Sequence, residues 1–226
     1  MARVTEAAAG AVASRLADVR RRVQEAGGDP GSVRIVAVTK GFGADTVEAA
    51  FTAGLRDVGE NYAQELVAKA AATDLPVRWH FLGPVQRNKV KRLAPLVSAW
   101  HGIDRAAAAD AVAAASPGVE VLVQVNLTGD NGRPGCPPDE VDMLVAHCRQ
   151  RPIALTGLMA VGPEGDLDRA RACFTWLARR AHQLGLRELS MGMSDDFEVA
   201  VQEGATTLRL GRVLFGPRPR LRTVRR

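Results

Sequence analysis

The sequence predicts an α/β protein built as a single-domain (β/α)₈ TIM barrel with an extra helix at its amino-terminal end. Short apolar runs alternate with segments of helical periodicity, which is typical of parallel β/α units. Eight such runs are present, and a chain of 226 residues approaches the roughly 250 residues of a barrel domain. An open, doubly wound sheet is the alternative, because short runs are ambiguous.

The expected elements follow one another without a linker-like stretch. The first is an Ala/Arg-rich amphipathic helix at Thr5–Ala26. The eight strands are expected at Val33–Thr39, Arg56–Glu60, Val77–Leu82, Ser98–His101, Glu120–Asn126, Ile153–Leu158, Glu188–Met191 and Thr207–Leu210. The intervening segments carry helix formers with a period near 3.6, at Ala44–Ala53, Ala63–Ala72, Arg105–Ala115, Pro138–Arg149, Leu167–Leu184 and Phe197–Glu203.

The positive charge of the chain is concentrated at its carboxyl end. The formal net charge is +5, and residues 216–226 contain five arginines and no acid, so the rest of the chain is about neutral. We therefore expect a barrel domain over residues 1–216 and a disordered basic Pro/Arg tail over residues 217–226. A neutral body does not indicate a nucleic acid as partner.

Targeting and redox signals are weak. No apolar run approaches the roughly 18 to 20 residues that span a bilayer, and charged residues are spread through the amino-terminal segment. Cys136, Cys148 and Cys173 form no Cys-x-x-Cys pair, so neither a disulfide framework nor a zinc site is indicated. The sequence thus predicts a cytoplasmic protein without a metal site.

Lys40 is the candidate for covalent chemistry. It is one of four lysines in a chain with twenty-six arginines, and it directly follows the first predicted strand. A desolvated lysine can lose its proton and attack a carbonyl to form a Schiff base, whereas arginine stays charged. The alternative is a solvated lysine that ends a strand.

The loops after the last two strands have the chemistry of a phosphate site. In a barrel the active residues lie at the carboxyl ends of the strands, and phosphate often binds after strands seven and eight. Small residues and glycines over Ser190–Ser194 let backbone N–H groups approach an anion, and Arg209 can add a charge-assisted contact. Asp195 and Glu198 also have the spacing of an ordinary capping box, and both interpretations can hold together.

Six motifs together resemble one family. They lie in order over nearly the whole chain, at Ala37–Lys40, Gly59–Glu65, Trp79–Lys89, Gly157–Ala160, Leu189–Asp196 and Arg209–Gly216. The chain is identified from them as a member of the pyridoxal phosphate homeostasis proteins. This resemblance implies the barrel of the alanine racemase N-terminal domain, the type III fold of pyridoxal phosphate proteins, with pyridoxal 5'-phosphate (PLP) as cofactor.

The resemblance also implies the site. Its lysine is Lys40, which would hold PLP as a Schiff base. The phosphate would be held by residues from Ser190 to Ser194 together with Arg209 and Gly211. The pyridine ring would be lined by Asn61, His80 and Met159.

Two functional classes compete. The first is a non-catalytic PLP-binding protein that buffers the cofactor or delivers it to enzymes through transient contacts, as a monomer or weak dimer. The second is a PLP-dependent amino-acid racemase with weak activity. A racemase of this fold needs a second β-domain and a tyrosine base at the opposite cofactor face, and the only tyrosine is Tyr62. The sequence therefore favours the binding protein over the enzyme.

Overall fold

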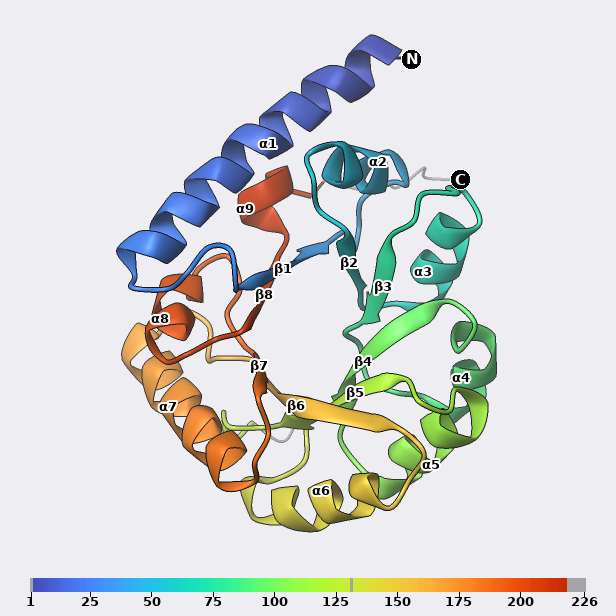
Figure 1. Cartoon of the computed structure of the whole chain (residues 1–226), viewed down its shortest axis with the longest axis vertical. Helices are drawn as coiled ribbons and strands as arrows, with labels where there is room; N and C mark the ends of the chain where they lie inside the picture. The colour runs from blue at the N-terminus through green and yellow to red at the C-terminus, as the bar shows by residue number, and fades with distance from the viewer. Residues whose placement is uncertain (1, 131, 219–226) are drawn as a thin grey trace, which may run out of the picture.

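Eight parallel strands form a closed barrel in chain order, and helices surround it (Figure 1). This computed structural model describes residues 2–130 and 132–218. The strands are β1 Arg34–Val38, β2 Asp57–Glu60, β3 Arg78–Phe81, β4 Val97–Ile103, β5 Glu120–Val125, β6 Ala154–Ala160, β7 Glu188–Ser190 and β8 Thr207–Leu210.

The barrel closes because β1 pairs with both β2 and β8. Val36 lies in register with Asp57 on one side and with Arg209 on the other. Side chains alternate along each strand, so one set points into the barrel and the other packs under the helices. The register therefore decides which polar residues meet inside the barrel.

Helices cover the outside of the barrel. They are α2 Asp45–Thr52, α3 Ala63–Ala70, α4 Arg87–Leu93, α5 Ala106–Ala115, α6 Val141–Arg149, α7 Leu167–Gln183, α8 Phe197–Gln202 and α9 Arg212–Phe215, with a 3₁₀ turn at Pro138–Glu140. The longest helix, α1 Ala2–Glu25, precedes the barrel and lies across α2, α8 and α9 (Figure 1).

The apolar core lies between the strands and the helices. Trp100 of β4, Phe174 of α7 and Phe197 of α8 are among its largest fully buried side chains. Replacing such a residue with alanine costs about 3 to 5 kcal/mol, because the lost transfer energy and the cavity add. This layer fixes the strands, and hence the loops at their carboxyl ends.

The predicted fold class is confirmed. All eight strands form, with bounds that differ from the predicted ones by at most two residues, and the amino-terminal helix is present. Two short helices, α4 and α9, were not among the predicted elements. In α4 only Val90 and Leu93 are buried, so the segment has little apolar periodicity from which a helix could be inferred.

Most of the predicted basic tail, residues 217–226, lies outside the described residues. Residues 219–226 lie outside the described residues, while Arg218 packs beside Gly41. Within residues 2–130 and 132–218, no helix is both long and apolar enough to cross a bilayer.

Candidate functional site

Lys40 lies at the carboxyl-end mouth of the barrel, two residues beyond β1, and its side chain is partly buried. Burial lowers the pKa of Lys40, and the positive charges of Arg218 and Arg209 lower it further. The carboxylates of Glu60 and Glu65 act in the opposite direction. The net lowering of the Lys40 pKa increases the fraction of the neutral amine, which is the nucleophilic form.

Both backbone neighbours of Lys40 are held by α3. The Lys69 ammonium donates to the Thr39 carbonyl oxygen at 2.7 Å, and the Gly41 N–H donates to Glu65 Oε2 at 2.8 Å. Lys69 Nζ also lies 3.1 Å from Glu65 Oε2, so one ion pair connects the two contacts. We call Thr39, Glu60, Glu65 and Lys69 the α3 clamp.

Glu60 completes the α3 clamp from β2. Its Oε1 accepts hydrogen bonds from Lys69 at 2.5 Å and from the Thr39 hydroxyl at 2.6 Å. The residue is 0% exposed, and burial raises its pKa while these two bonds oppose the rise. A buried carboxylate next to a buried ammonium requires this close pairing, since either charge alone would be costly.

The other lysines differ from Lys40. All three N–H groups of Lys69 have acceptors within the α3 clamp, so its nitrogen is held as an ammonium. Lys89 and Lys91 are exposed on α4. Lys40 is the lysine that combines partial burial with a lowered pKa.

Arg209 lies inside the barrel, 5% exposed, on β8. It donates from Nη1 to the Ser190 hydroxyl oxygen at 2.7 Å and from Nη2 to the Ala160 carbonyl oxygen at 2.8 Å. Burial lowers its pKa to about 10, so it stays a cation at neutral pH. Among the described residues no carboxylate forms a salt bridge with it, and the charge of Asp196 acts on it only from a longer distance, so the buried cation has no direct ion-pair partner.

The loops after β7 and β8 contact one another. The Ser194 hydroxyl oxygen accepts a hydrogen bond from the Val213 N–H at 3.2 Å, which places Ser194 beside the turn at Gly211. Gly192 has φ +92°, and an added Cβ would lie 2.7 Å from Ala200 Cβ, so glycine is required at this turn.

The expected capping box does not form, which is a correction. The helix α8 begins at Phe197, as predicted, but its N-cap residue is Asp196 rather than Asp195 and has no capping side-chain bond. Asp196 instead accepts from the Met193 N–H at 2.6 Å, and Asp195 pairs with Arg212. Both aspartates thus order the loops around Ser194.

The three expected ring-lining residues have different surroundings. Asn61 is partly exposed just after β2, where its carbonyl lies so close to Gly83 that a Cβ there would be 2.0 Å away. Met159 is buried on β6 in register with Ser190. His80 is buried, and both its ring nitrogens have protein partners, namely Asp57 and His101.

Several polar residues of the interior were not found from the sequence. His101, Asp57 and Gln124 are buried on β4, β2 and β5, and all three lie outside the six motifs. The Oε1 of Gln124 has no hydrogen-bond partner among the described residues. Gln124 lies in register with Met159, so a buried acceptor is available beside a predicted site residue.

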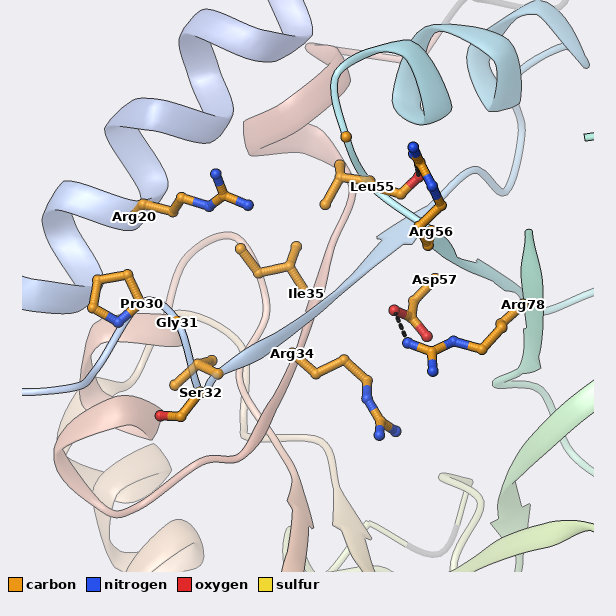
Figure 2. Close-up of a pocket in the computed structure, with 12 residues that line it drawn as sticks. Arg20, Pro30, Gly31, Ser32, Arg34, Ile35, Leu55, Arg56, Asp57 and Arg78 are labelled. Atoms are coloured by element: carbon orange, nitrogen blue, oxygen red, sulfur yellow. Dashed lines mark hydrogen bonds and ion pairs between the residues drawn. The ribbon is translucent and has the colours of Figure 1, made fainter. Parts of the chain in front are cut away.

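A pocket of about 360 Å³ lies at the opposite end of the barrel, where β1, β2 and β3 begin (Figure 2). Arg34, Arg56, Asp57 and Arg78 contribute to its lining. Figure 2 shows the Arg78 guanidinium against the Asp57 carboxylate, with an Nη2 to Oδ2 distance of 2.7 Å. Lys40 lies at the other end of β1, so this pocket is separate from the mouth.

The residues of the mouth fit PLP. Its aldehyde needs an amine with a lowered pKa, which Lys40 offers. Its negatively charged phosphate needs a cation, and Arg209 is buried without a carboxylate partner in the described part of the chain. The fold and this donor set define a barrel of the PLP-binding type.

Comparison with known proteins points to the same class of protein. The family model of the alanine racemase N-terminal domain matches residues 9–219. The pyridoxal phosphate homeostasis protein of Pseudomonas aeruginosa is 42% identical over 217 residues, covering 92% of this chain and 94% of that protein. The corresponding protein of Escherichia coli is 34% identical and covers 92% and 97%. The chain therefore belongs to the family of the pyridoxal phosphate homeostasis proteins, as the six motifs predicted.

Solved structures agree on the fold. PipY of Synechococcus elongatus, solved with PLP bound, superposes with a TM-score of 0.78 at 34% identity, covering 91% of this chain and all of that one. Alanine racemase of Bacillus anthracis superposes with a TM-score of 0.71 at 16% identity, covering 94% of this chain and 57% of that one. The second likeness shows the shared barrel alone.

Proposed function

We propose that this protein binds PLP covalently through Lys40 and acts in PLP homeostasis rather than as an enzyme. The carrying observation is the combination, at one mouth, of an amine with a lowered pKa and a buried guanidinium without a direct ion-pair partner among the described residues. The names of its relatives and the PLP bound to PipY support the choice of cofactor. When bound, PLP supplies an aldehyde with which an amine condenses reversibly.

Lys40 presents the amine, and the α3 clamp holds the backbone on both sides of this residue. Lys69 fixes the carbonyl before Lys40 and Glu65 fixes the N–H after it, so the backbone on both sides of the amine is fixed. A fixed backbone lowers the entropy that must be lost when the side chain is ordered in a covalent bond. The clamp thereby favours retention of the cofactor.

For the phosphate we propose Ser194 and Gly211 at the mouth, with Ser190 and Arg209 below them. Ser190 and Arg209 are bonded to each other inside the barrel, and the positive charge of Arg209 acts over a longer distance there than in water. For the ring we propose Asn61, His80 and Met159. Gln124 adds a buried oxygen that can accept a hydrogen bond from the ligand.

The absence of catalysis is part of the proposal. Racemisation requires an acid or base on each face of the reacting carbon. The only tyrosine in the sequence, Tyr62, has 61% of its surface exposed, so it is not held inside the mouth. We further propose a cytoplasmic location and transient contacts with the enzymes that receive the cofactor, with the protein a monomer or weak dimer.

A spectroscopic titration tests this function. PLP is added to the wild type, Lys40→Ala and the control Lys91→Ala, and the visible absorbance of the cofactor is followed. Wild type and Lys91→Ala should give the same saturable spectral change, because Lys91 is exposed on α4. Lys40→Ala should give none. An unchanged response in Lys40→Ala would overturn the assignment.

A further inference from the structure

A chain of side chains crosses the interior of the barrel. Asp57 Oδ1 lies 2.8 Å from His80 Nε2, and His80 Nδ1 lies 2.9 Å from His101 Nε2. His101 Nδ1 lies 2.9 Å from the Ser190 hydroxyl, which Arg209 reaches at 2.7 Å. His101 is on β4 and Ser190 on β7, so the contact spans strands that are not neighbours. We call these five residues the interior chain.

With both imidazoles neutral, the two ends of the interior chain fix the direction of every hydrogen bond. Arg209 can only donate, and an ionised Asp57 can only accept. Burial by itself raises the pKa of Asp57, but hydrogen bonds from His80 and Arg78 outweigh it and hold the pKa at about 2. Asp57 is therefore ionised at neutral pH.

The three members between these ends must then each pass on one hydrogen. His80 donates from Nε2 to Asp57 and accepts at Nδ1, and His101 donates from Nε2 to His80 and accepts at Nδ1 from Ser190. The Ser190 oxygen is left to accept from Arg209. In this arrangement each neutral imidazole carries its hydrogen on Nε2.

The surroundings of His101 agree with a neutral ring. Burial lowers its pKa well below the usual value, and the positive charges of Arg209 and Arg34 lower it further. One additional proton would make His101 donate to Ser190, whose oxygen already accepts from Arg209, and the serine hydrogen would lose its acceptor. His101 therefore resists protonation.

We propose that Asp57, His80 and His101 are positioning residues, which hold Ser190 and Arg209 in the one arrangement that presents a cation to the cofactor. The proposal rests on the proposed function, because Arg209 is assigned there to PLP. Asp57 borders the pocket at the far end of the barrel (Figure 2), so the supporting contact is made at the end opposite Lys40.

Imidazole nitrogen NMR of the protein without added PLP tests the chain itself. His80 and His101 should both show the neutral Nε2–H tautomer at neutral pH, and His101 should keep it between about pH 5 and 8. In Asp57→Asn the side-chain amide can donate as well as accept, so the tautomer of His80 should become mixed. In the control Asp110→Asn, which alters the similar His147–Asp110 pair on the surface, both signals should stay unchanged.

PLP binding tests the positioning. Asp57→Asn and Ser190→Ala should each bind PLP roughly 10-fold more weakly, equivalent to about 1.4 kcal/mol, and Asp110→Asn should bind as the wild type does. An Nδ1–H tautomer or an imidazolium at neutral pH, in either interior histidine, would overturn the proposal. So would full PLP affinity in Asp57→Asn. The NMR result does not depend on PLP, so it separates a failure here from a failure of the proposed function.

Discussion

Lys69→Met tests the α3 clamp. Lys69 is 5% exposed and donates to Glu60, Glu65 and the Thr39 carbonyl. The substitution keeps the aliphatic volume but leaves Glu60 buried without its cation. Removing one partner of a buried ion pair costs about 3 to 5 kcal/mol, so we expect a loss of that size in the free energy of unfolding.

Urea unfolding at neutral pH measures this loss and its origin. Wild type, Lys69→Met, Glu60→Gln and the double variant form a cycle, with exposed Lys91→Met as the control expected within about 0.5 kcal/mol of wild type. Because Lys69→Met leaves Glu60 without a cation and Glu60→Gln leaves Lys69 with Glu65 alone, the double variant should lose less than the sum of the two. A loss below about 1 kcal/mol in Lys69→Met, or purely additive losses, would refute the clamp.

Three further results are expected. The pKa of Asp57 is lowered from 3.8 to about 2, so its ionised form contributes about 2 kcal/mol of stability above pH 4, and this contribution is lost as the pH falls through 2. Acid unfolding of Asp57→Asn should lack this contribution. Identical acid-unfolding profiles of the variant and the wild type would contradict it. Arg209→Gln should bind PLP roughly 10- to 100-fold more weakly in equilibrium titration, since about 1.5 to 3 kcal/mol of charge-assisted contact is lost, and unchanged affinity would place the phosphate elsewhere. Deuterium exchange at the α-carbon of L-alanine, with PLP-saturated protein in D₂O, should reach only trace rates, because one missing acid or base lowers the rate by about 10²- to 10⁴-fold. Inversion at ordinary enzymatic rates that is lost in Lys40→Ala would show a second base.

The strands and the position of Lys40 could be predicted because they depend on local sequence. Each strand is a short apolar run between helical segments, and Lys40 directly follows the first run. The two missed helices lack that information. The segment of α4 is rich in basic residues with two buried side chains, and α9 is only four residues long.

The interior chain could not be predicted, because it depends on register and closure. His80 and His101 are 21 residues apart, and they meet only because β3 and β4 pair with an irregular register. His101 and Ser190 meet only because the barrel closes. The α3 clamp could be predicted only in part. Glu60 and Glu65 lie in one of the six motifs, whereas Lys69 lies outside all of them.

Mapping of the covalent adduct tests the central claim most directly. The protein is saturated with PLP, reduced with borohydride, digested and analysed by mass spectrometry. We predict one stoichiometric adduct at Lys40, which has a lowered pKa. Lys69 donates to three acceptors, and Lys89 and Lys91 are exposed. A stoichiometric adduct at Lys69, Lys89 or Lys91, with Lys40 unmodified, would contradict the account.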